Sequence, residues 1–143
     1  MEKKENVMTE ELAIADFERL AEAKGVDCDP SLMNEEDAKA FLGLRRKIVK
    51  KIMSGAAVVT DEGDITFTLS DRNPEAIRGK VLTFTMPDAA AYMGADSYNE
   101  KQSMHKFFAM LSAMTGEDIG LFRKIEPIDL KAVMAIGTFF LSD

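Results

Sequence analysis

The chain has 143 residues, a formal net charge of −7 and 46% hydrophobic residues, values that are typical of one globular domain and exclude a disordered tail. Its apolar runs are shorter than the roughly 18 residues that a membrane-spanning helix needs, and the N-terminus lacks the apolar segment of a signal peptide. We therefore expect a cytoplasmic protein without membrane contact.

Two helices joined by a short loop are predicted in the first 55 residues, as an αα-hairpin. The first covers about residues 10–24, because Thr9 is a good N-cap, apolar residues recur at helical spacing and Gly25 suits the C-terminal end. The second begins after Asn34 and ends at Gly55, with acidic residues in its first turn and basic residues in its last turns.

Alternating apolar and polar residues follow, and they predict a small antiparallel sheet of about three strands. The segment Asp61-Glu62-Gly63-Asp64 is typical of a hairpin loop between the first two strands. Leu82, Phe84 and Met86 are expected on one face of the third strand, and that apolar face needs a cover. The expected strands are residues 57–60, 65–69 and 80–86.

Further helices are predicted to cover the sheet. A short helix ends at Gly94, a longer one begins at Ser97 or Asn99 and ends at Gly116, and a one-turn segment precedes a last helix that starts at Pro127. The fold class is therefore α+β: an N-terminal helical hairpin, a small antiparallel sheet and C-terminal helices packed on it. We expect residues 1–55 to form an N-terminal helical extension and residues 56–143 to form the sheet with its covering helices. The two parts are expected to make one compact unit.

Side chains for catalysis are scarce, so we expect no enzyme. His105 is the only histidine and is expected on the solvated side of a helix, and Cys28 has acidic neighbours that disfavour its thiolate. One Cys and one His cannot supply a zinc site, and the acidic loop 61–64 lacks the ligand spacing of an EF-hand. Phosphate-binding glycine motifs do not occur, so we expect neither a metal nor a cofactor.

The charge is distributed in three blocks. Residues 1–38 carry 12 acidic and 4 basic side chains, residues 39–53 carry 6 basic and no acidic ones, and residues 54–143 carry 13 acidic and 8 basic ones. One short basic segment in an acidic protein does not favour nucleic-acid binding. Arg46, Lys47 and Lys50 could bind an acidic partner segment. Alternatively, they form a solvated face that complements the helix end and the acidic first helix.

Methionine and phenylalanine are the second candidate binding feature. Met side chains adapt to different apolar partners, although residues at this helical spacing are mostly core. Met110 and Phe139 fall off the main apolar stripes and are candidates for an exposed patch that binds a partner or a second copy. The apolar candidates for partner binding are Met104, Phe107, Phe108, Met110, Met114, Phe139 and Phe140.

The order of segments over residues 64–141 resembles the tail assembly chaperones of tailed phages, particularly the Mu-like class. The resemblance rests on a strand end, a helix end, an acidic turn and the start of a terminal helix: Leu82-Thr83-Phe84-Thr85-Met86-Pro87-Asp88, Met110-Leu111-Ser112-Ala113-Met114-Thr115-Gly116, Glu117-Asp118-Ile119 and Ile125-Glu126-Pro127-Ile128-Asp129-Leu130. Its most specific piece is an L-x-x-x-T-G helix end, followed by an acidic turn and an I/L-x-x-x-D-L helix start. The N-terminal 55 residues and the long connection 70–79 depart from this pattern.

The resemblance implies a cytoplasmic protein without enzymatic activity that binds the helical tape measure protein and assists assembly of the tail tube around it. The tape measure protein, and also the tail tube protein, are the partners it implies. An adaptable apolar groove and an acidic exterior are compatible with that role. The alternative hypothesis is a small structural or adaptor subunit that self-associates into a homo-oligomer without chaperone activity.

Overall fold

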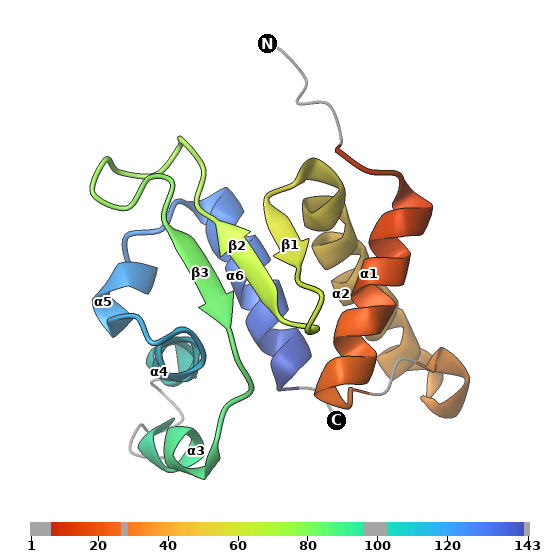
Figure 1. Cartoon of the computed structure of the whole chain (residues 1–143). Helices are drawn as coiled ribbons and strands as arrows, with labels where there is room; N and C mark the ends of the chain where they lie inside the picture. The colour runs from red at the N-terminus through yellow and green to blue at the C-terminus, as the bar shows by residue number, and fades with distance from the viewer. Residues whose placement is uncertain (1–6, 27–28, 96–102, 142–143) are drawn as a thin grey trace.

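The computed structural model describes residues 7–26, 29–95 and 103–141. It has the expected α+β class, with N-terminal helices, a three-stranded antiparallel sheet and C-terminal helices (Figure 1). The elements in chain order are α1 (Glu10–Lys24), a 3-10 turn η1 (Pro30–Leu32), α2 (Glu35–Ser54), β1 (Ala57–Val59), β2 (Ile65–Thr68), β3 (Val81–Phe84), α3 (Ala89–Ala95), α4 (Ser103–Thr115), α5 (Ile119–Phe122) and α6 (Pro127–Phe140).

Local capping groups set the ends of the first two helices. The Thr9 hydroxyl accepts a hydrogen bond from the backbone N–H of Leu12, and the Asn34 side chain accepts one from Asp37 at 2.7 Å. Both helices end at a glycine with a left-handed backbone, Gly25 for α1 and Gly55 for α2. The predicted hairpin of helices is therefore confirmed.

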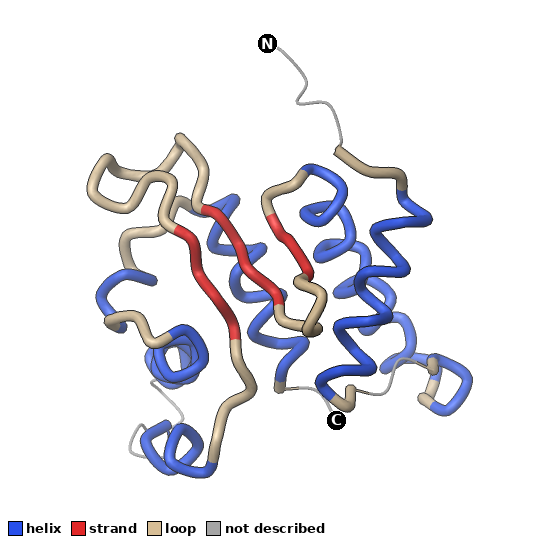
Figure 2. Tube along the Cα trace, in the orientation of Figure 1, coloured by secondary structure: helices blue, strands red, loops and turns tan. Residues whose placement is uncertain are grey.

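The three strands pair in sequence order, β1-β2-β3, and every pair is antiparallel. Alternation divides the sheet into a buried face and a solvated face, on which Val58 and Val81 are exposed. Helix α6 passes behind the sheet, whereas no helix crosses the face turned toward the viewer in Figure 2. Met86 does not lie on the buried face as expected: β3 ends at Phe84, and Met86 is 43% exposed.

One hydrophobic core joins the hairpin, the sheet and α6. The ring of Phe17 on α1 lies 5.1 Å from that of Phe139 on α6, and Phe140 stacks on Phe84 of β3 at 6.3 Å. The last helix is therefore buried between the helical hairpin, chiefly α2, and the sheet.

The C-terminal helices follow the expected order with one difference in their bounds. Helix α3 continues through Gly94 to Ala95 instead of ending there. Pro127 occupies the first turn of α6 behind the capping side chain of Glu126, as expected. The predicted helix start at Ser97 or Asn99, and Cys28, lie outside the described residues.

Candidate functional site

Most of the apolar residues predicted to bind a partner lie in the core instead. Met110 is 4% exposed and Phe139 is fully buried, so the expectation of an exposed patch at these two residues is wrong. The reason is that α4 and α6 are apolar around most of their circumference and are enclosed by neighbouring elements. The candidates that prove to be core residues are Phe108, Met110, Met114, Phe139 and Phe140.

Two apolar candidates remain near the surface. Met104 is 50% exposed at the start of α4, and Phe107 is partly buried against Gly137 of α6. The neighbouring His105 is exposed, as expected, and its Nδ1 lies 3.2 Å from a guanidinium nitrogen of Arg123. None of the seven apolar candidates lines either of the two grooves described next.

The basic candidates, in contrast, are exposed on α2 and lie beside two grooves. The first groove runs between α1 and α2 and has a volume of about 670 Å³. Its floor is apolar and its rim carries Arg45, Arg46 and Lys50. The lining residues are Glu10, Ile14, Leu42, Arg45, Arg46, Val49, Lys50 and Met53.

The second groove runs between α2 and α6 and has a volume of about 850 Å³. It contains two methionines, Met33 and Met134, together with other apolar side chains and three lysines. We call it the α2–α6 groove. Its lining residues are Met33, Asp37, Lys39, Ala40, Phe41, Gly43, Leu44, Lys47, Lys131, Met134, Ala135, Thr138 and Leu141.

Positive charge at both grooves is not neutralised by ion pairs within the part of the chain that the structure describes. The ion pairs there involve other cations: Arg19, Lys24, Arg72 and Lys80. The basic face of α2 is therefore solvated, and no described ion pair joins it to α1. Cations at the rim of an apolar groove favour an acidic amphipathic segment, because its charges are attracted while its apolar face is buried.

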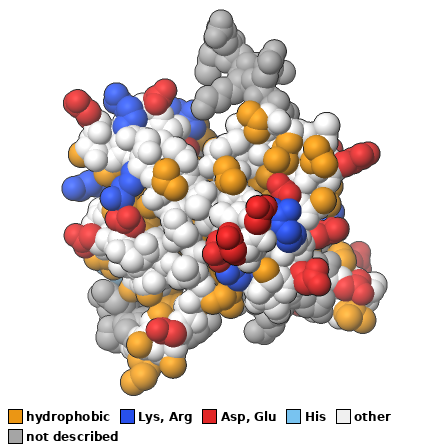
Figure 3. Space-filling view, in the orientation of Figure 1, with side chains coloured by type: hydrophobic (Ala, Val, Ile, Leu, Met, Phe, Trp, Pro, Cys, Tyr) orange, Lys and Arg blue, Asp and Glu red, His pale blue; other side chains and the backbone are white. Residues whose placement is uncertain are grey.

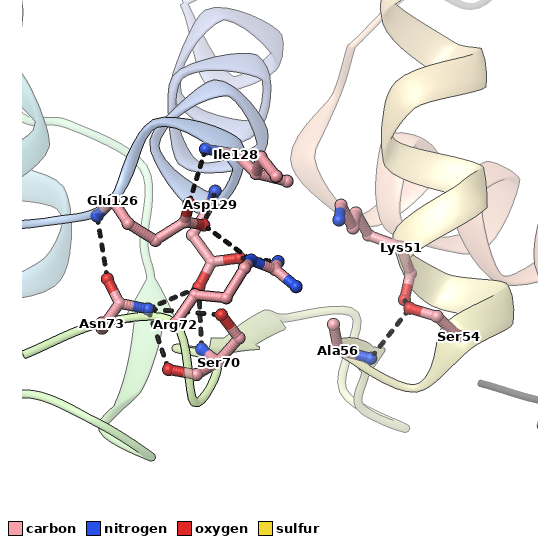
Figure 4. A network of polar contacts seen from close by, with 9 residues as sticks. All are labelled: Lys51, Ser54, Ala56, Ser70, Arg72, Asn73, Glu126, Ile128 and Asp129. Atoms are coloured by element: carbon pink, nitrogen blue, oxygen red, sulfur yellow. Dashed lines mark hydrogen bonds and ion pairs between the residues drawn. The ribbon is translucent and has the colours of Figure 1, made fainter. Parts of the chain in front are cut away.

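A buried polar network, which the sequence alone did not reveal, joins the connection 70–79 to the start of α6 (Figure 4). Asp129 is 2% exposed, and its carboxylate accepts hydrogen bonds from the Ser70 backbone N–H at 2.7 Å, the Asn73 side-chain amide at 2.7 Å and the Arg72 guanidinium at 3.2 Å. The Asn73 side-chain oxygen accepts a hydrogen bond from the Glu126 backbone N–H at 2.9 Å.

This environment controls the charge of Asp129. Burial by itself raises the pKa of Asp129, but the hydrogen bonds from Ser70 and Asn73 and the nearby charge of Arg72 outweigh it and lower the pKa below its ordinary value of 3.8. An ionised carboxylate with its acceptor sites filled is a structural anchor. It does not have the raised pKa of a general acid.

The residues that carry the family resemblance have structural roles. The Thr115 hydroxyl donates a hydrogen bond to the Leu111 backbone oxygen at 2.8 Å, and Gly116 has a φ of 71°, so these residues end α4. Asp129 of the I/L-x-x-x-D-L piece is the anchor of the buried network. The two pieces therefore specify how the C-terminal helices begin and end.

The acidic loop 61–64 is a hairpin loop, as predicted. Asp64 forms an ion pair with Lys24 at 2.5 Å, and the Thr60 hydroxyl accepts a hydrogen bond from the Asp64 backbone N–H at 3.1 Å. Within residues 7–26, 29–95 and 103–141, no three His, Cys, Asp or Glu side chains are grouped so that they could hold a metal ion. No helix in those ranges is both long enough and apolar enough to cross a membrane.

No protein-family model, curated protein or solved structure matches this chain. The geometry of the described residues therefore carries the functional interpretation.

Proposed function

We propose that this chain is a non-catalytic tail assembly chaperone of a phage or prophage, and that it holds an amphipathic helix of the tape measure protein in the α2–α6 groove. The observation that carries the proposal is the groove itself, an apolar channel of about 850 Å³ with lysines at its rim. The order of segments over residues 64–141 supports the choice of partner.

The groove has the chemistry that a helix with one apolar face requires. Such a helix buries residues at i, i+3, i+4 and i+7 and leaves its polar face in water. Met33 and Met134 can adapt to apolar side chains of different shapes, because thioether side chains are unbranched and flexible. Lys47 and Lys131 would then lie beside acidic residues at the edge of the bound helix.

Binding at this groove would serve a chaperone function because the tape measure protein implied by the resemblance is a long helical protein. A long helix with an exposed apolar face self-associates unless that face is covered. Covering it by a reversible contact prevents aggregation and still allows displacement during assembly. The chaperone itself remains acidic overall, with a net charge of −7, which favours solubility of the complex.

Coexpression with the tape measure protein of the same genome tests the proposal. The wild-type chain should keep that protein soluble, and the variant Lys47→Glu/Lys131→Glu should lose this effect without a change in its own unfolding midpoint. Lys124→Glu is the matched control, because Lys124 is exposed and does not line the groove. The proposal fails if the tape measure protein is equally insoluble with and without the wild-type chain.

A further inference from the structure

The outer side of α1 carries a regular acidic stripe. Glu11, Ala15, Glu18 and Glu22 follow one another at i, i+4, i+7 and i+11, so they share one face of the helix, and all four are exposed. This face is opposite the buried residues of α1, which include Ala13 and Phe17. In Figure 3, acidic side chains are visible over the part of the surface that α1 occupies. We call these four residues the acidic stripe.

Helix α2 carries a stripe of the same spacing and the opposite charge. Lys39, Gly43, Arg46 and Lys50 also follow at i, i+4, i+7 and i+11, and all four are exposed. A Cβ atom added at Gly43 would meet no heavy atom within 4 Å, so open space lies in front of this part of the helix. We call these four residues the basic stripe.

No ion pair joins the two stripes within the described part of one chain. Helices α1 and α2 contact each other through their buried sides, where the rings of Phe17 and Phe41 lie 6.3 Å apart. The acidic stripe lies opposite the buried side of α1, whereas Arg46 and Lys50 of the basic stripe stand at the rim of the groove between α1 and α2. Within the described part of the chain, the residues of α1 that form ion pairs are Asp16, Arg19 and Lys24. None of these three belongs to the acidic stripe.

We propose that the acidic stripe of one copy packs against the basic stripe of a second copy, with the two helices antiparallel. The spacing 0, 4, 7 and 11 is unchanged by reversal, so an antiparallel pair places Glu11 beside Lys50 and Glu22 beside Lys39. The small residues then lie opposite long ones, Ala15 facing Arg46 and Gly43 facing Glu18. Small residues in these places let the helices approach while the long side chains are accommodated.

The chemistry of this contact distinguishes a second copy from other occupants. A nucleic acid would bind the basic stripe and would make no contact with the acidic stripe. A second copy uses both, and the antiparallel arrangement also opposes the two helix dipoles favourably. The contact is mainly between exposed charges, so it is weak and sensitive to salt. Self-association does not depend on the proposed chaperone role. Lys39 and Gly43 also line the α2–α6 groove, so a second copy on the basic stripe would compete with a helix bound in that groove.

Charge-reversed variants of the purified full-length chain test this contact without the tape measure protein. Light scattering should show the mass rising with concentration from 15.8 kDa toward at least twice that value at low ionic strength. The rise should disappear at about 0.5 M salt, where the screening length is only a few ångströms. Glu18→Lys/Glu22→Lys and Arg46→Glu/Lys50→Glu should each remain monomeric when studied alone.

Mixing the two charge-reversed variants tests whether the acidic stripe binds the basic stripe of another copy. In an equal mixture, each variant offers one native and one reversed stripe. The two reversed stripes do not pair, because positions 11 and 50 would both be acidic and positions 22 and 39 both basic. The native acidic stripe of the second variant and the native basic stripe of the first variant attract each other as in the wild type, so the mixture should form a complex of about twice the mass of one chain at low salt. Glu62→Lys/Glu75→Lys has the same net charge as the first variant and reverses exposed residues outside both stripes, so it should associate like the wild type.

Three outcomes would overturn the proposal: a wild-type chain that remains monomeric at low salt, variants that associate as the wild type does, or a mixture that remains monomeric. Circular dichroism and unfolding midpoints show whether each variant is folded. Solubilisation of the tape measure protein by a chain that stays monomeric would contradict self-association and leave the proposed function intact.

Discussion

The rings of Phe17 and Phe139 lie 5.1 Å apart with an angle of 57° between their planes, so a side chain of the first helix, α1, reaches the last helix, α6. Phe139 also contacts Phe140, whose ring centroid is 5.6 Å away at 75°. Tilted arrangements of this kind are favourable for aromatic rings and add to the gain from burial. The N-terminal helices are therefore part of the same core as the sheet and α6.

Replacing Phe139 by Ala should destabilise the protein by about 3–5 kcal/mol, because it removes a buried ring and leaves a cavity between α1 and α6. Urea unfolding followed by circular dichroism measures the change. Met104→Ala is the control, since Met104 is half exposed, and its effect should stay within about 0.5 kcal/mol. Equal effects of the two substitutions would contradict the assigned burial.

Asp129 should make stability depend on pH in the acid range. Its pKa is lower in the folded state than the ordinary value of 3.8, so ionised Asp129 stabilises the fold fully above about pH 5, and this contribution is lost as the pH falls through the lowered pKa. Asp129→Asn should cost about 2–4 kcal/mol at pH 7, because its amide group would face the donors of the network.

The difference between wild type and Asp129→Asn should shrink as the pH is lowered from 7 to 3, which urea unfolding at each pH would show. Asp61→Asn provides the comparison, since Asp61 is exposed in the hairpin loop. It should leave both the stability and its pH dependence nearly unchanged. A constant difference across the pH range would mean that Asp129 does not contribute as a carboxylate.

Two glycines inside helices should respond oppositely to the same substitution. A Cβ atom at Gly137 would lie 2.6 Å from a methyl carbon of Leu111 and 3.3 Å from the Phe107 ring, whereas one at Gly43 would lie in open space. Gly43→Ala should stabilise the protein by about 0.5–1 kcal/mol, because alanine favours the helix. Gly137→Ala should destabilise it by about 1–3 kcal/mol through overpacking. Thermal unfolding of both variants provides the measurement.

Gly63 couples the first hairpin loop to α1. It has a φ of 83°, and a Cβ atom there would clash with the Cβ atom of Ala23. Gly63→Ala should cost more than the about 1–2 kcal/mol expected for the left-handed backbone alone. Adding Ala23→Gly should recover the part due to the clash, and a double-mutant cycle in urea would measure that coupling. Strictly additive effects would show that the two residues do not touch.

The local parts of the fold could be predicted from the sequence. Thr9, Asn34, Gly25 and Gly55 act within a few residues of themselves, so helix ends can be inferred without knowing the rest of the structure. The strands could be predicted for a similar reason, because alternation distinguishes a half-buried strand. The basic candidates Arg46, Lys47 and Lys50 do border grooves, although the sequence could not show which helices would form the opposite walls.

The exposure of the apolar candidates could not be predicted, because it depends on how many neighbours enclose a helix. Met110 and Phe139 lie off the main apolar stripes of α4 and α6. A residue off the stripe is exposed only when the helix is buried along a single face, and these two helices are buried along more than one. The Asp129 network was missed for another reason. Its hydrogen bond to Asn73 spans 56 residues, and no local pattern connects an aspartate in a first helical turn to a distant turn.

The contact between Phe17 and Phe139 has a consequence for the order of folding. The two rings touch but lie far apart in the sequence, so their contact closes a long loop and forms only after that entropic cost is met. Until α6 docks, the side of α1 that carries Phe17, which is fully buried in the folded protein, stays uncovered. Any opening that detaches α6 exposes this apolar side of α1 again.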